Sequence, residues 1–309
     1  MTKIYKTMLI NKIKGSRILE PFFISIILIL FVSCGNNEKS NTILKDTNTT
    51  ITIDPLKTLS FFAWDGVKNY ENILSKLEHY NKPTIYLNPL ENGENTFIKN
   101  SEKLHDLNSN IWYLTSAISD YPSDDYLSNQ INTIVQYNSN HSKKIIGMSF
   151  DFEPWIEFTD QNSSDNITSW NKYLDFMNKA KTLLKNENLN ISIIIPFWLD
   201  KISQAYPNNR PLNYDIIDIA DEVIVMAYTK KFEDLLLYSK SSLIYADSTN
   251  KSIKIALEMV ENNNPEITFY GNAKDIKNIL YKDINYTSFD GYNIHTLDAF
   301  YDSNITLSY

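Results

Sequence analysis

Two carboxylic acids lie close together near the middle of the chain, in the run Ile145–Trp155. Side chains on a strand alternate between its two faces, so Asp151 and Glu153 would share one face, with their Cβ atoms roughly 7 Å apart. Two acids at that separation raise the pKa of one of them, and a carboxyl group that stays protonated near neutral pH is what a general acid needs. The spacing predicts acid catalysis, with a plain pair of solvated acids at a strand end as the alternative.

Eight short runs rich in β-branched and aromatic residues predict the strands that position this pair. They are Ser60–Trp64, Thr84–Asn88, Ile111–Ser116, Ile145–Asp151, Ile191–Pro196, Glu222–Ala227, Ile253–Glu258 and Gly291–His295. Helical spacing of apolar residues lies between them, in Tyr70–Tyr80, Asp124–Tyr137, Ser169–Leu184, Tyr214–Ala220, Phe232–Tyr245 and Ala273–Tyr281. Strands that alternate with helices predict an α/β fold with a parallel sheet, and eight such units predict a single closed (β/α)₈ TIM barrel.

An open, doubly wound sheet is the alternative fold, but no glycine-rich phosphate loop follows the first strand, and the whole chain has only seven glycines. In a (β/α)₈ barrel the functional groups lie at the carboxyl ends of the strands. If Phe150 and Phe152 pack against the outer helices, Asp151 and Glu153 line the mouth of the barrel.

The fourth predicted strand resembles the motif D-G-x-D-x-D-x-E of family 18 glycoside hydrolases, the chitinase-like barrels. Gly147, Asp151 and Glu153 match this motif, whereas Ile146 and Ser149 stand where the family has its first two aspartates. The resemblance implies that Glu153 is the general acid and that Asp151 supports the acetamido group of the substrate. It further implies a glycan substrate that contains N-acetylhexosamine, hydrolysed with retention of configuration.

A second match lies at the sixth predicted strand, in Val225–Thr229. It is similar to the family's M-x-Y-D: Met226 and Tyr228 fit, and Thr229 replaces the aspartate. The resemblance implies that Tyr228 binds the acetamido oxygen, next to Met226 in the substrate site. The replaced acids leave open a second class of function, a catalytically inactive barrel that still binds carbohydrate.

Glu258 offers a different mechanism from the same strand ends. In many retaining barrel glycosidases the acid ends strand four and a nucleophile ends strand seven, which are the positions of Glu153 and Glu258. Carboxyl groups about 5–5.5 Å apart would indicate a direct nucleophile, and about 6.5–9.5 Å would indicate inversion. Glu258 could instead be a charge at the barrel rim, paired with a basic residue.

Aromatic residues gather at the same level of the predicted barrel. Trp64, Trp155 and Trp198 lie in or just after strands, and flat aromatic faces bury the C–H faces of sugar rings. We expect them to line the substrate site, together with His295 at the end of the eighth strand. Tryptophan is also common in barrel cores, and a structural histidine is an equal alternative for His295.

The first 33 residues are typical of a secretory signal peptide, with basic residues ahead of the apolar run Phe22–Val32. Eleven residues are too few to span a bilayer core of about 30 Å. Ser33-Cys34-Gly35 resembles a bacterial lipobox, so residues 1–33 are expected to be removed and Cys34 to carry a lipid; a plain signal anchor is the alternative. Residues 34–57 are then a flexible tether, and 58–309 the barrel domain.

Charge and composition limit the partners. The chain has a net charge of −8, and because its first 33 residues carry five basic side chains and one acidic, the remainder is at −12. Such a surface disfavours nucleic acid, and membrane contact is expected through the lipid alone. One cysteine and four histidines without ligand spacing predict no metal and no cofactor. We expect a monomer that acts on an oligo- or polysaccharide, anchored in a bacterial envelope and facing the periplasm or exterior.

Overall fold

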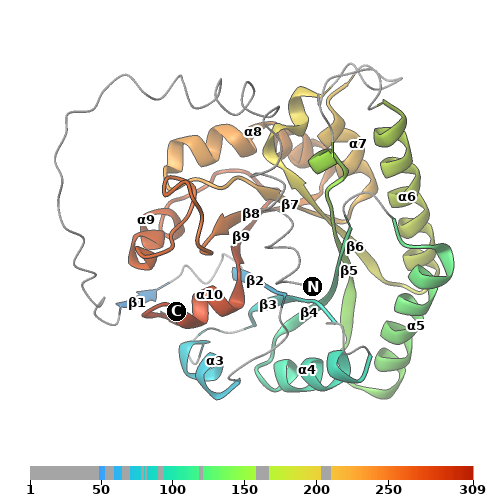
Figure 1. The fold of residues 1–309 in the computed structure, drawn as a ribbon, viewed down its shortest axis with the longest axis horizontal. Coiled ribbons are helices and arrows are strands. Elements are labelled where there is room, and N and C mark those ends of the chain that lie inside the picture. The colour runs from blue at the N-terminus through green and yellow to red at the C-terminus, as the bar shows by residue number, and fades with distance from the viewer. Residues whose placement is uncertain are drawn as a thin grey trace. The chain divides into compact units, whose positions relative to one another are not determined.

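A closed barrel of eight parallel strands forms the centre of the chain in the computed structural model (Figure 1). The described residues are 49–52, 59–64, 70–77, 80, 82–89, 94–117, 121–157, 167–202 and 210–308. The segment expected to be a signal peptide, residues 1–33, and the expected lipid site Cys34 lie outside the described residues. In the described part of the chain, no helix has the length and apolarity needed to cross a bilayer.

The barrel strands follow one another around the barrel in chain order. They are β2 (Leu59–Ala63), β3 (Thr84–Leu87), β4 (Asn110–Ala117), β5 (Ile145–Phe152), β6 (Asn190–Pro196), β7 (Glu222–Met226), β8 (Ser252–Glu258) and β9 (Phe289–His295). Each of the eight predicted strands is present, and each shifts by at most two residues at either end. The prediction of a single (β/α)₈ barrel is confirmed.

Helices cover the outside of the barrel (Figure 1). They are α3 (Tyr70–Leu77), α4 (Glu94–Asp106), α5 (Asp124–Asn140), α6 (Ile167–Asn186), α7 (Leu212–Ile219), α8 (Phe232–Thr249), α9 (Lys277–Leu280) and α10 (Leu297–Asp302). The sequence did not predict α4. Its buried face is built from Phe97, Ser101 and Leu104, and the small polar Ser101 interrupts the apolar repeat that marks a helix.

Two separate cores follow from the alternation of side chains along the strands. A large core lies between strands and helices and includes Phe150 and Phe152, which pack against Phe176 of α6. A smaller core fills the barrel itself. Its buried members are Phe62, Tyr86, Trp112, Leu114, Ile194, Ile224 and Ala256. The two phenylalanines therefore face the helices, as expected, and Asp151 and Glu153 face the barrel.

A β-bulge near the start of β5 sets this facing. Ile111 pairs with Ile145 but Trp112 pairs with Gly147, so Ile146 is an extra residue in β5. The bulge puts both Ile146 and Ser149 on the interior side, an odd separation that regular alternation forbids. Gly147 is required here, because a Cβ atom at this position would lie 2.0 Å from the carbonyl oxygen of Asn190.

A second bulge lies near the start of β9. Ile253 pairs with Phe289 but Ile255 pairs with Tyr292, so β9 has one extra residue. Gly291 lies there with φ of +104°, a backbone conformation that favours glycine. After the bulge, Tyr292 and Ile294 belong to the outer core, and the intervening side chains face the interior. In both β5, which carries the acid pair, and β9, which carries His295, one extra residue near the start of the strand shifts which of the later side chains face the interior.

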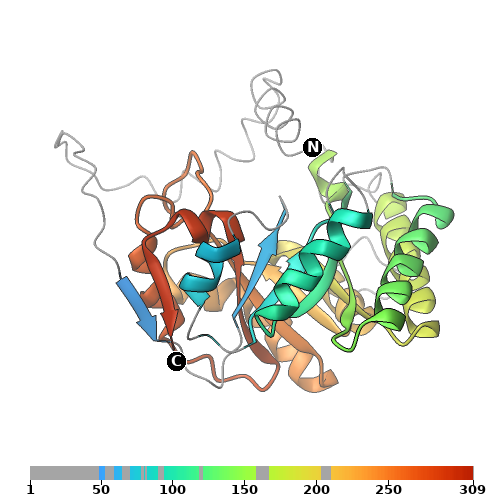
Figure 2. The ribbon, with the colours of Figure 1, turned by 90° about the horizontal axis from the view of Figure 1, so that it is seen from below.

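A two-stranded parallel sheet, which the sequence did not predict, joins the two ends of the described chain. β1 (Thr49–Thr52) pairs in register with β10 (Ile305–Ser308), and Figure 2 shows the two strands side by side. β1 lies within the segment expected to be a tether, and residues 48–309 form one compact unit. The domain boundary at residue 57 stays a prediction, but any domain cut there would lose β1.

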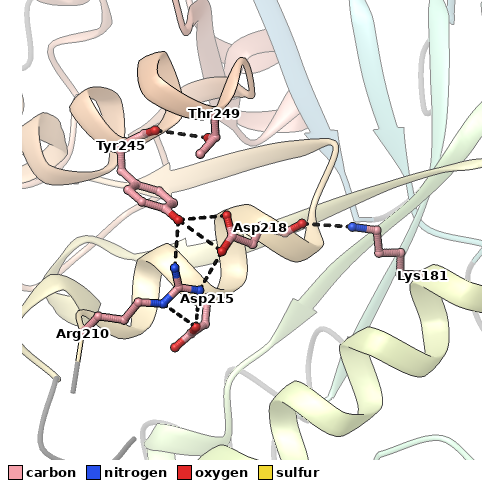
Figure 3. A network of polar contacts seen from close by, with 6 residues as sticks. All are labelled: Lys181, Arg210, Asp215, Asp218, Tyr245 and Thr249. Atoms are coloured by element: carbon pink, nitrogen blue, oxygen red, sulfur yellow. Dashed lines mark hydrogen bonds and ion pairs between the residues drawn. The ribbon is translucent and has the colours of Figure 1, made fainter. Parts of the chain in front are cut away.

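Helices α6, α7 and α8 are held together at the surface by a polar network (Figure 3). The guanidinium of Arg210 donates to Asp215 and Asp218 of α7, and to the hydroxyl of Tyr245 on α8. Tyr245 in turn donates to the Asp218 carboxylate at 3.0 Å, and Lys181 of α6 donates to the Asp218 carbonyl at 2.9 Å. The network fixes the start of α7, which follows β6 and the short 3-10 helix that contains Trp198.

Candidate active site

The acid pair lies at the carboxyl end of β5, on the interior side of the barrel. Asp151 is the second-last residue of β5, and Glu153 comes directly after the strand. The N–H of Glu153 donates a hydrogen bond to the Ala117 carbonyl at 2.8 Å. A short 3-10 helix begins immediately afterwards at Pro154, which ends the strand. The mouth of the barrel, as the term is used below, comprises Asp151, Glu153, Tyr228, Glu258 and His295.

Burial shifts both carboxyl groups toward the protonated form. It raises the pKa of Glu153 to about 7; a hydrogen bond from Trp155 and the positive charge of His295 act in the opposite direction. Burial and the nearby charge of Glu153 together raise the pKa of Asp151 well above its ordinary value. Asp151 Oδ1 is buried and accepts no hydrogen bond from the described residues. A protonated acid beside an acceptor without a partner suits proton transfer to a bound substrate.

Tyr228 reaches the same place from β7. It lies two residues beyond the strand, and its side chain packs with Met226 against the interior core. Burial raises its pKa well above the ordinary value, and the charges of Glu258, Asp151 and Glu153 raise it further. Tyr228 is therefore a neutral hydroxyl beside three carboxyl groups at neutral pH. The two segments that carry the sequence motifs meet at one site.

Glu258 and His295 form a pair at the ends of β8 and β9. His295 Nδ1 lies 2.9 Å and 3.1 Å from the two carboxylate oxygens of Glu258. Glu258 is only 7% exposed, and it also accepts a hydrogen bond from the Val260 N–H at 2.7 Å. The sequence placed both residues in the site separately, without pairing them.

The tryptophans differ in what they offer a substrate. Trp155 is only 6% exposed, because it stacks on the fully buried Trp170 and meets the edge of Trp198. It contributes mainly its indole N–H, through the hydrogen bond to Glu153. Trp198 and Trp64 are half-buried, and Trp64 packs against Phe62 of the interior core. Trp64 and Trp198 thus keep aromatic surface that a ligand can touch.

Asp200 is a candidate that the sequence reasoning missed. It lies in the 3-10 helix Phe197–Lys201 after β6, two residues beyond Trp198. Burial raises its pKa, and its Oδ1 has no hydrogen-bond partner in the part of the chain that the structure describes. An acid within a few residues of a barrel strand's carboxyl end was the signal that could have found it.

The described residues contain no cluster of side chains that could bind a metal ion. No group of three or more His, Cys, Asp or Glu side chains there is placed to hold an ion. Glu258 already binds His295, and the raised pKa values of Asp151 and Glu153 favour their protonated forms, whereas metal ligands must be deprotonated. The absence of a cofactor stays a prediction.

Comparison with known proteins adds structural likeness only. No protein-family model matches the chain, and no curated protein matches it. Among solved structures it is similar to a chitinase from Chromobacterium violaceum, at 11% identity over 79% of this chain and 96% of the other, with a TM-score of 0.47. A GH18 chitinase from Pseudoalteromonas aurantia is 11% identical over 80% of this chain and 96% of the other, with a TM-score of 0.48. The spore cortex-lytic enzyme SleL of Bacillus megaterium is 11% identical over 85% of this chain and 76% of the other, with a TM-score of 0.46.

Proposed function

We propose that the barrel is a glycoside hydrolase in which Glu153 is the general acid. The observation that carries this proposal is the state of Glu153: a carboxyl group inside a barrel mouth, with its pKa raised to about 7 and a second acid on the same strand face. A group with that pKa holds a proton at neutral pH and can still release it, which is the requirement for protonating a glycosidic oxygen.

The substrate class that we propose is a glycan containing N-acetylhexosamine. Glu153 gives its proton to the leaving glycosidic oxygen, while the acetamido oxygen of the substrate attacks the anomeric carbon. Asp151 and Tyr228 hold the acetamido group during this step, consistent with the buried Asp151 Oδ1 and the neutral Tyr228 hydroxyl. Water then attacks the anomeric carbon, its proton passes to the Glu153 carboxylate, and the configuration is retained.

Glu258 is less suited to be a direct nucleophile. It is 7% exposed, and its carboxylate accepts hydrogen bonds from Val260 and contacts His295 through both oxygens. A nucleophile needs an oxygen that is free to reach the anomeric carbon. These contacts favour acetamido assistance over the mechanism with Glu258 as nucleophile.

We also propose that the protein is an exported lipoprotein, anchored through Cys34 and acting as a monomer in the cell envelope. This proposal rests on the signal-like run Phe22–Val32 and the residues around Cys34. Metabolic labelling with a fatty-acid analogue tests it. We expect the full-length protein to be labelled and Cys34→Ala to remain unlabelled; equal labelling of both would contradict the proposal.

A glycan-panel assay tests the enzymatic proposal, using residues 48–309 so that β1 is kept. We expect hydrolysis of aryl N-acetylglucosaminides over glucosides and mannosides, and a loss of about 10²–10⁴-fold in kcat for Glu153→Gln. The exposed Glu187→Gln is the control and should retain full activity. Oligosaccharide binding without turnover by the wild type would instead show a carbohydrate-binding barrel.

A further inference from the structure

The Glu258–His295 pair has no task in the reaction proposed above, although it lies in the same mouth. Both partners end neighbouring strands, and the pairing of β8 with β9 places them directly opposite one another. A backbone hydrogen bond from Met259 N–H to the His295 carbonyl, at 2.7 Å, closes the strand ends beneath them. The pair is therefore built on the rigid part of the barrel.

The imidazole ring is fixed in its orientation. Its Nδ1 faces the Glu258 carboxylate, an acceptor, so Nδ1 carries the proton that is shared. The ring stacks on Tyr228 with an interplanar angle of 18°, and its other side meets the edge of Phe62. Nε2 has no hydrogen bond to any described residue, and 26% of the side chain is exposed. One nitrogen is held and the other remains available at the mouth.

The electrostatics of the mouth give this ring a role. Asp151, Glu153 and Glu258 are all acids, and no lysine or arginine forms an ion pair with any of them in the described ranges. His295 is the cation that acts on Glu153, and Glu258 and the hydroxyl of Tyr228 are the other titratable groups beside it. When Glu153 has given up its proton, it becomes a buried anion, and His295 is the group placed to offset that charge.

We propose that Glu258 and His295 are a positioning pair for the general acid: Glu258 fixes and charges the imidazole, and the imidazolium stabilises the Glu153 carboxylate between the two halves of the reaction. This inference rests on the proposed function and assigns Glu258 a supporting role. Neither residue forms a bond to the substrate. The charge stays in place while the Glu153 proton leaves and returns.

A titration of the histidine rings by NMR tests the pair without any substrate. The chain has four histidines, so each ring can be followed separately. We expect the ring of His295 to lose its proton more readily in Glu258→Gln and in Glu153→Gln than in the wild type, because each variant removes a neighbouring carboxylate, and to change little in Glu258→Asp. The matched control is His141, which contacts the exposed Glu102 at 3.2 Å; Glu102→Gln should move its pKa by less than about 0.5. If the His295 ring titrates identically in the wild type, Glu258→Gln and Glu153→Gln, the proposal is overturned.

Kinetics with an N-acetylglucosaminide separates this role from simple structural support. In His295→Gln the alkaline limb of the kcat profile should move to higher pH, because Glu153 loses a neighbouring cation. We expect kcat to fall about tenfold with little change in KM in both His295→Gln and Glu258→Gln, and Glu258→Asp to keep most of the wild-type kcat. If kcat falls equally at every pH and the alkaline limb of its pH profile does not move, the pair has no role in catalysis. If the wild type hydrolyses no glycan, the proposed function fails, and the NMR titration still decides whether the charges are coupled.

Discussion

The two ends of the barrel interior both contain buried acids, but only one end neutralises them. At the floor, where the strands begin, Glu222 accepts hydrogen bonds from Tyr86 and from Ser192, the latter at 3.0 Å. Lys254, only 2% exposed, lies 3.4 Å from Glu222 and also binds Asp290. These five residues are called the floor cluster below. Every carboxylate of this cluster has a donor or a cation.

At the mouth Glu258 has His295 as its partner, whereas the acid pair Asp151 and Glu153 is left short of partners. Asp151 and Glu153 keep raised pKa values, Asp151 Oδ1 accepts no hydrogen bond from the described residues, and the nearest cation is a histidine. A fully paired network stabilises a fold and holds one arrangement, whereas acids without partners cost stability and persist where they do chemistry. The contrast indicates that the floor cluster serves the fold and the mouth serves the reaction.

The largest expected effect breaks the floor cluster at its lysine. Lys254→Met should lower the free energy of unfolding by about 3–5 kcal/mol, because Glu222 loses its buried cation. Urea denaturation of residues 48–309 measures this. Adding Glu222→Gln to Lys254→Met should recover part of the loss, since the uncompensated charge is then gone. A single-variant loss below about 1 kcal/mol would show that the floor cluster is not a stabilising network.

A smaller effect, of about 3 kcal/mol, concerns pH and the mouth. Unfolded Glu153 releases its proton near 4.5 and folded Glu153 near 7, so the folded chain binds more protons between these values. Stability should therefore fall as pH rises from about 4.5 to about 7, and Glu153→Gln should flatten this part of the curve. Thermal unfolding across pH 4–8 tests it, with the exposed Glu187→Gln as the control. Parallel curves for wild type and Glu153→Gln would contradict the prediction.

The smallest effect comes from removing one phenolic hydroxyl at each end. Tyr86→Phe should cost about 1–3 kcal/mol, since Glu222 loses a buried donor. Tyr228→Phe should change stability by less than about 0.5 kcal/mol, because no hydrogen bond joins its hydroxyl to the described residues, yet it should reduce hydrolysis of N-acetylated substrates about tenfold. Equal effects on stability would remove the distinction between floor cluster and mouth.

Much of this contrast was readable from the sequence. The eight strands were marked by runs of β-branched residues, and the alternation of Phe150 and Phe152 with two acids gave the facing of the mouth. Glu258 and His295 were each placed at a strand end. Their pairing required knowing that β8 and β9 have matching lengths beyond the bulge, which no local pattern shows.

Other parts depended on packing that a single segment does not encode. Trp155 follows the strand as a substrate-binding residue would, but Trp170, fifteen residues later on α6, covers its face and leaves the indole N–H for Glu153. The β1–β10 sheet joins two four-residue strands from the two ends of the chain, and alternation over four residues is too short to mark a strand in the sequence. The floor cluster was missed because Glu222 and Lys254 lie at or near the start of their strands, where function was not sought.

The bulge at Ile146 has a consequence for how this chain can change by mutation. Loss of that one codon would restore regular alternation between Ile145 and the end of β5. Phe150 and Phe152 would still face α6 and both acids would still face the barrel, because the residues after the bulge keep their present partners on β4, Trp112 with Gly147 and Ser116 with Asp151. The bulge thus lets β5 lose one residue upstream of its acids without exchanging its two faces, whereas a one-residue shift of register in the regularly paired part of the strand would put core side chains in the mouth.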